Sequence, residues 1–127
     1  MIAVDTSALM AIVLNTPEAD DCEVALAADD NVVISAGTLA EAFIVASQRN
    51  LGTEMASLID RLGCTVVSVT LATSKRVAQA YIQWGKGNHP AGLNFGDCFA
   101  YQVAKENACP LLFVGKDFSR TDIKSAL

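Results

Sequence analysis

Four short, largely apolar segments alternate with longer helical patterns along this chain, and this alternation constrains its fold more than any other feature. Each segment has the length and composition expected of a buried strand. The four segments are residues 2–5, 32–35, 64–69 and 111–114. Strands that alternate with helices predict a central, mostly parallel sheet in a three-layer α/β/α fold with right-handed crossovers.

Helices are predicted in the intervals between these strands, where capping and turn residues mark their ends. Thr6 or Ser7 is expected to cap the first helix, and Asp97 is expected to open the last one, which starts at Phe95. One long loop, residues 85–94, contains the only histidine, His89, which we interpret as an ordinary loop residue. The expected helical ranges are about 6–14, 17–28, 38–48, 53–62 and 71–84, followed by the helix from residue 95.

Length and composition favour one folded domain covering residues 1–127. The chain is 52% hydrophobic, which is enough for a core. No apolar run approaches the roughly 18 residues that span a bilayer, and the N-terminus lacks the basic region of a signal peptide. The four cysteines are scattered without a C-x-x-C spacing, which is typical of reduced, buried thiols. We therefore expect a cytoplasmic protein without a membrane segment.

Charge is distributed unevenly along the chain. The net charge is −5, but residues 1–74 carry 2 Lys/Arg and 10 Asp/Glu, whereas residues 75–127 carry 7 Lys/Arg and 4 Asp/Glu. The acidic total argues against nonspecific binding of polyanions. The basic C-terminal part still allows a local positive surface.

Three acidic residues stand alone in apolar surroundings. Asp5 is the only charge among residues 1–17, Glu41 the only one among 31–48, and Asp97 the only one among 87–104. Each alone would be interpreted as a helix cap or a solvated side chain. In a parallel sheet, however, ligands bind at the carboxyl ends of the strands. Asp5, Glu41, Asp97 and Asp117 all map to that edge, so we expect them to converge.

Converging carboxylates repel one another and raise one another's pKa unless a cation compensates them. Ligation by carboxylates alone suits hard ions such as Mg²⁺ or Mn²⁺. Such an ion can lower the pKa of a bound water and neutralise charge on a phosphoryl transition state. The sequence therefore indicates a metal site built from Asp5, Glu41, Asp97 and Asp117.

Three segments carry a resemblance to a known family. MIAVDTSALMAIVLNTPEA, TLAEAFIVASQR and LNFGDCFAYQVAKENACPLLFVGKDFSRTDI resemble, in order, the blocks of the PIN-domain nucleases, and most specifically the VapC-type toxins of toxin–antitoxin pairs. The resemblance implies a Mg²⁺- or Mn²⁺-dependent endoribonuclease with the same four acids as its catalytic and metal-binding residues. Thr6 and Ser7 match the hydroxyl residues that support the first acid, and Asp122 matches a second, weaker acid.

The resemblance also implies partners. These are an RNA substrate, a cognate antitoxin protein, and a second copy of the chain in a homodimer, with early helices forming the dimer face and the antitoxin groove. The chain departs from the family at Val114 and Lys116, where many relatives have Lys and Asn, so a basic side chain near the site has moved by two positions.

Other interpretations fit the sequence less well. A receiver domain needs a paired acid after the first strand, and a haloacid-dehalogenase-type phosphatase needs an Asp where this chain has Ser7. Two alternatives stay open at this point. One is a PIN-domain nuclease outside a toxin–antitoxin system, and the other is a non-catalytic PIN-like binding module.

Overall fold

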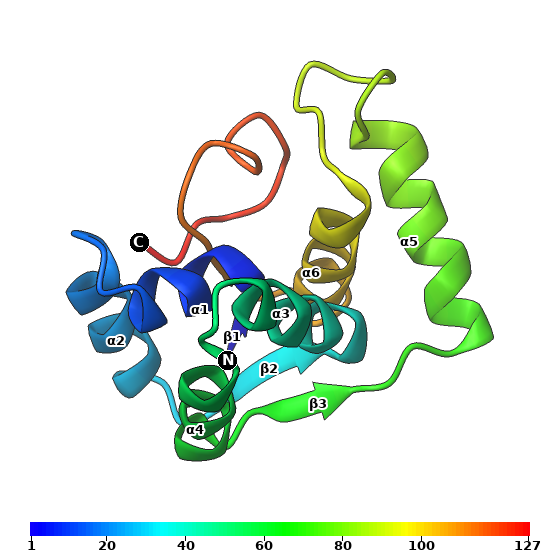
Figure 1. The fold of residues 1–127 in the computed structure, drawn as a ribbon. Helices are drawn as coiled ribbons and strands as arrows, with labels where there is room; N and C mark the ends of the chain where they lie inside the picture. Colours follow the sequence, from blue (N-terminus) through cyan, green and yellow to red (C-terminus); the bar gives the residue numbers. More distant parts are fainter.

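The computed structural model describes all of residues 1–127 and contains one four-stranded sheet. The strand order is β3-β2-β1-β4, and every pairing is parallel. The sheet runs through the middle of the molecule with helices on both sides (Figure 1). Its strands are β1 (Ile2–Val4), β2 (Val32–Ser35), β3 (Thr65–Val67) and β4 (Leu111–Leu112).

Six helices fill the two outer layers, and none of them combines the length and apolar character needed to cross a membrane. The helices are α1 (Thr6–Val13), α2 (Ala19–Ala27), α3 (Ala36–Gln48), α4 (Gly52–Leu62), α5 (Leu71–Trp84) and α6 (Phe95–Glu106).

Two hydrophobic clusters pack on the two faces of the sheet. Successive strand residues point to opposite faces, so Val4 and Ile34 belong to one cluster whereas Ala3 and Val33 belong to the other. The first cluster is completed by residues of α1, α2, α3 and α4, and the second by residues of α5 and α6. This confirms the three-layer α/β/α fold with a parallel sheet.

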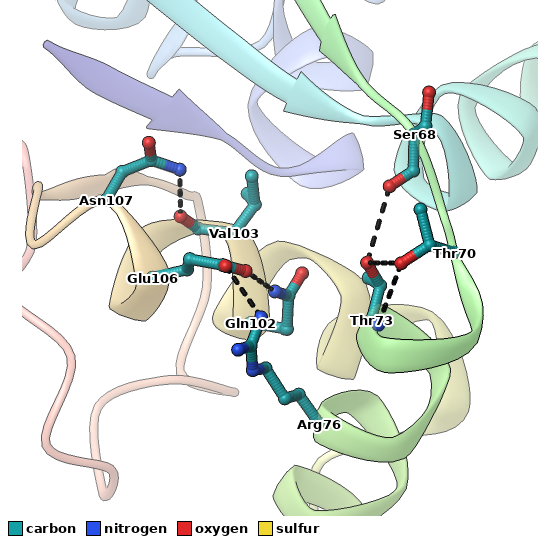
Figure 2. Close-up of polar contacts among 8 residues, drawn as sticks. All are labelled: Ser68, Thr70, Thr73, Arg76, Gln102, Val103, Glu106 and Asn107. Carbon is teal, nitrogen blue, oxygen red and sulfur yellow. Dashed lines mark hydrogen bonds and ion pairs between the residues drawn. The ribbon is translucent and has the colours of Figure 1, made fainter.

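Figure 2 shows polar contacts at the start of α5 and between α5 and the C-terminal half of α6. Thr70 caps α5 by accepting the Thr73 N–H at 3.2 Å. One turn further along α5, Arg76 forms an ion pair of 2.6 Å with Glu106 of α6, and Gln102 also donates to Glu106. These contacts help to hold α6, whose first turn carries Asp97, in place beside the sheet.

Several element ends differ from the sequence prediction. Neither Thr6 nor Ser7 caps α1, because the side chain of Asp5 does so by accepting the Ser7 N–H. The last helix is capped by Asn94, and Asp97 lies three residues further on, inside the first turn. The helix predicted at 38–48 starts earlier, since Ser35 accepts the Gly37 N–H as its cap.

The remaining differences concern lengths. The helix predicted at 17–28 forms only over Ala19–Ala27, and the strand predicted at 64–69 pairs only over Thr65–Val67. The last strand ends at Leu112 instead of residue 114. Its shortening has a local cause, because the Val114 N–H donates to the Ser7 hydroxyl.

Candidate active site

Asp5 follows β1 directly and is only 4% exposed. Its Oδ2 accepts two hydrogen bonds from Ser7, one from the backbone N–H at 3.0 Å and one from the hydroxyl at 2.7 Å. Its Oδ1 is also buried and has no hydrogen-bond partner. A buried carboxylate oxygen without a donor is costly, so this atom has free capacity for a cation.

Ser7 also accepts the Val114 N–H at 3.0 Å. One hydroxyl therefore joins Asp5, at the end of β1, to the backbone that follows β4. The Asp5 carboxylate is thereby fixed relative to two neighbouring strands.

Glu41 lies on α3 and is oriented by the other predicted hydroxyl. The Thr6 hydroxyl is 2.6 Å from Glu41 Oε1, and it also lies 3.4 Å from the Thr38 carbonyl. Since Thr6 is adjacent to Asp5, this contact brings the α3 carboxylate toward the end of β1.

Asp97 is 6% exposed and takes part in a capping box with Asn94. The Asn94 N–H donates to Asp97 Oδ2 at 3.0 Å, and the Asp97 N–H donates to Asn94 Oδ1 at 2.8 Å. Asp97 is thus not the N-cap residue of α6, but its side chain takes part in the cap by accepting the Asn94 N–H. The capping box uses one carboxylate oxygen and leaves the other free.

The pKa values show that the acids influence one another. Burial raises the pKa of Asp97 to about 7, against the opposing hydrogen bond from Asn94. The charges of Asp5, Asp117 and Glu41 make smaller contributions to this same rise. Burial also raises the pKa of Asp5 to about 6; the Ser7 hydrogen bonds oppose this rise, and the Glu41 charge adds to it. Asp97 therefore lies within electrostatic reach of all three other predicted acids.

The four carboxylates do not form a complete metal-coordination site in this structure. In this conformation no group of three or more His, Cys, Asp or Glu side chains is arranged to hold one metal ion. Asp5, Glu41 and Asp97 are instead held by Ser7, Thr6 and Asn94. Asp117 lies on an exposed turn after β4. Two features are nevertheless compatible with a bound hard cation. The Oδ1 of Asp5 has no hydrogen-bond partner, and the negative charges of the other acids repel the Asp97 carboxylate.

Asp122 has a different environment. Its carboxylate accepts the Tyr101 hydroxyl at 2.7 Å and the Lys105 ammonium at 2.9 Å, and the Trp84 indole N–H donates to the Tyr101 hydroxyl. Partial burial opposes ionisation of Asp122, but the hydrogen bond from Tyr101 and the hydrogen bond and charge of Lys105 hold its pKa below its usual range. Asp122 therefore anchors the C-terminal segment to α6 through Lys105 and Tyr101.

His89 is a loop residue, as the sequence suggested. Its Nδ1 accepts the Ala91 N–H at 3.0 Å, and its ring packs edge-on against Trp84 with centroids 4.7 Å apart. Sequence reasoning missed Asn94 as a functional neighbour. The Asn-x-x-Asp spacing at 94–97 was the available signal, because it is a variant of the capping box.

Comparisons with known proteins agree with this fold. Residues 2–124 match the sequence model described as the PIN domain. Ribonuclease VapC30 of Mycobacterium tuberculosis is 38% identical over 125 residues, which cover 96% of this chain and 95% of that protein.

Two solved structures share the fold. VapC20 of Mycobacterium tuberculosis, described as a sarcin-ricin-loop-cleaving toxin, has a TM-score of 0.78 at 18% identity, over 97% of this chain and 96% of that one. A chain of a toxin–antitoxin complex from Klebsiella pneumoniae has a TM-score of 0.69 at 14% identity, over 96% of this chain and 93% of that one. At such low identities these two comparisons bear on the fold alone.

Proposed function

This chain belongs to the PIN-domain family and, within it, to the VapC group, and from that premise we propose that it is an endoribonuclease toxin of a toxin–antitoxin pair that depends on Mg²⁺ or Mn²⁺. One observation carries the proposal: Asp5, whose buried Oδ1 has no hydrogen-bond partner, lies close enough to Asp97 that its charge, with those of Asp117 and Glu41, adds to the larger effect of burial in raising the Asp97 pKa. These acids come from four separated parts of the chain. A fold that holds them within reach of one another needs a compensating cation for all of them to be ionised at neutral pH.

Asp5, Glu41, Asp97 and Asp117 are the residues that would hold the ion. When bound, the ion supplies a water of lowered pKa and neutralises charge on the phosphodiester group. Thr6 and Ser7 support this role by donating to Glu41 and Asp5, so that oxygens not used by these bonds stay available. Asn94 does the same for Asp97. The only histidine is not placed to compete for this role, since it packs against Trp84 in the loop.

Similarity to relatives named ribonuclease supports RNA as the substrate. The proposal is tested by incubating purified protein with total RNA in Mg²⁺ or Mn²⁺ and, separately, in excess EDTA. We expect cleavage with metal and its loss in EDTA, followed by recovery when metal is restored. Undiminished cleavage after rigorous metal removal would exclude the mechanism.

We propose a cognate antitoxin as the protein partner. An apolar hollow between α1, α2 and α4 supports this, because Ile12, Leu26, Leu58 and Leu62 line it beside the ion pair of Glu23 and Arg61. An amphipathic antitoxin helix suits a hollow of this character. Expression of the chain alone should arrest growth, and co-expression with the adjacent small reading frame should restore it. Normal growth at high levels of folded protein would instead favour a nuclease outside a toxin–antitoxin system.

We also propose a homodimer. Its support is a surface that we call the apolar face, formed by exposed or half-buried residues of α3, α5, α6 and the segment before α5. Two apolar hollows meet on this face, and both are lined by Phe95 and Phe99. The apolar face consists of Ile44, Val69, Tyr81, Ile82, Phe95 and Phe99.

The proposed compartment is the cytoplasm. All four cysteines are free, and burial raises the pKa of each thiol, that of Cys98 to about 11. Thiols in this state are mostly protonated at neutral pH and react slowly. They are suited to a reducing environment and need no disulfide partner.

A further inference from the structure

We propose that Gly96 is a positioning residue of the acidic site, because the absence of its side chain makes the space in which the Glu41 carboxylate lies. The inference rests on the proposed function, since it assigns Gly96 a role in arranging a metal-binding carboxylate. Gly96 precedes Asp97 in the first turn of α6, so the same turn supplies one acid and receives another.

The contact between Gly96 and Glu41 is very close. A Cβ atom at residue 96 would lie 2.6 Å from Glu41 Cδ and 2.9 Å from Oε1, and Oε2 would be nearer still. Real Cβ atoms essentially never approach heavy atoms within 3.0 Å. Any side chain at residue 96 must therefore displace the Glu41 carboxylate.

Backbone conformation does not explain this glycine. Gly96 is not among the residues with positive φ, and it lies within a helix, where glycine is less favourable than alanine. Neither turn geometry nor helix propensity favours glycine at this position. Packing against Glu41 supplies the reason.

The two helices are held at this close separation independently of Glu41. A Cβ at Gly37 of α3 would lie 2.6 Å from Phe99 Cγ and 2.7 Å from Cε1, so the first turn of α3 packs against α6 through a second glycine. Meanwhile Thr6 holds Glu41 Oε1. The carboxylate is thus confined between Thr6 and Gly96, whereas the helix backbones are fixed by other contacts.

Replacing Gly37 or Gly96 by alanine is expected to have different effects on the protein. Gly37→Ala presses on an aromatic ring packed against the core, so it should destabilise the protein whatever residue 41 is. Gly96→Ala presses on the end of a flexible side chain, so the fold should survive and the carboxylate should move. The pair therefore separates a general packing defect from a displaced ligand.

The test is a double-mutant cycle on the metal-free protein followed by Mn²⁺ titration. Gly96→Ala should lower the melting temperature when Glu41 is present, but raise it in a Glu41→Ala background, where alanine simply favours the helix. Gly37→Ala, the matched control, should lower it in both backgrounds. Equal effects of Gly96→Ala in the two backgrounds would overturn the proposal.

The second readout is the Mn²⁺ concentration that gives half of the maximal thermal stabilisation. Gly96→Ala should raise it by about tenfold, as expected when a residue that supports a ligand is altered, and Gly37→Ala should leave it within about twofold. An unchanged Mn²⁺ dependence in Gly96→Ala would also overturn the proposal. If the unmodified protein shows no stabilisation by Mn²⁺, the proposed function fails instead, and the metal-free cycle still reports the contact between Gly96 and Glu41.

Discussion

At the scale of single residues, Asp97 combines two roles that are often assigned to different side chains. One carboxylate oxygen completes the capping box with Asn94. The same carboxylate is also repelled by the negative charges of Asp5, Asp117 and Glu41. A cap alone would favour the ionised form, because the N–H of Asn94 stabilises the negative charge. The pKa is nevertheless raised to about 7, so burial and repulsion outweigh the cap.

The raised pKa values of Asp5 and Asp97 predict an unusual pH dependence for the free energy of unfolding of the metal-free protein. The pKa values of Asp5 and Asp97 are about 6 and about 7 in the folded state, against 3.8 for an ordinary Asp. The folded state therefore binds protons more tightly than the unfolded state, and this stability is lost as the pH rises through 6 and 7. Between pH 5 and pH 8 we expect a loss on the order of 4 kcal/mol.

Thermal or urea unfolding in EDTA across that pH range measures the effect. The Asp5→Asn/Asp97→Asn double variant is the control, since neither of its amides titrates, and its stability should vary much less over the same range. Saturating Mg²⁺ should flatten the profile of the unmodified protein as well. A metal-free protein that becomes more stable from pH 5 to pH 8 would contradict the assignment of a repulsive acidic cluster.

At the scale of elements, Ser7 joins the end of β1 to the segment after β4. Ser7→Ala removes a donor from Asp5 and leaves the Val114 N–H without its partner. We expect a loss of about 1–3 kcal/mol of stability, the usual cost of leaving a buried donor unsatisfied, together with weaker metal binding. Ser119→Ala is a suitable control, because the Ser119 hydroxyl makes only an exposed bond to the Lys116 carbonyl.

Urea unfolding of both variants and Mn²⁺ titration of each provide the comparison. Ser119→Ala should stay within about 0.5 kcal/mol of the unmodified protein. A Ser7→Ala variant as stable as the Ser119→Ala variant, with the same Mn²⁺ dependence, would show that the tie between β1 and β4 has no such role.

Element order was predictable from sequence because periodicity and capping residues are local signals. The alternation of strands and helices predicted the parallel sheet. The isolation of Asp5, Glu41 and Asp97 in apolar surroundings predicted that these acids lie together at one edge of that sheet. The contacts among these acids were not predictable in the same way. Thr6 bonds to Glu41 across 35 positions of sequence, and Gly96 meets Glu41 only because α3 and α6 pack closely.

Caps were predicted less well than elements, for a physical reason. A hydroxyl or carboxylate near a helix start can bond the backbone or a distant partner, and sequence does not decide between them. Thr6 and Ser7 have the composition of caps, but their hydroxyls bond Glu41 and Asp5. Asp5 then takes over the capping role.

At the scale of the whole molecule, the apolar face defined above predicts self-association. Ile82 is 70% exposed on this face, and Val24 is 69% exposed on α2, away from it. Ile82→Lys should shift a dimer to monomer, because a buried ammonium opposes association, whereas Val24→Lys should leave the dimer intact. Light scattering after size-exclusion chromatography distinguishes the two, and equal dissociation of both variants would place the interface elsewhere.

The central claim is that four carboxylates form one metal site, and the most direct test is the Mg²⁺-induced rise in melting temperature of the unmodified protein and of Asp97→Asn. Asparagine keeps the size of the side chain and can still accept the Asn94 N–H. Metal-free Asp97→Asn should be as stable as the unmodified protein or more stable, because one buried, repelled charge is gone.

Saturating Mg²⁺ should raise the melting temperature of the unmodified protein, because an ion that binds only the folded state stabilises that state. The rise should be much smaller in Asp97→Asn, because the variant has lost one charged ligand and binds the ion more weakly. RNA cleavage measured on the same samples should fall on the order of 100-fold. If Asp97→Asn shows the same Mg²⁺-induced rise and cleaves RNA at the unmodified rate, Asp97 is only a helix cap and the four-carboxylate site is wrong.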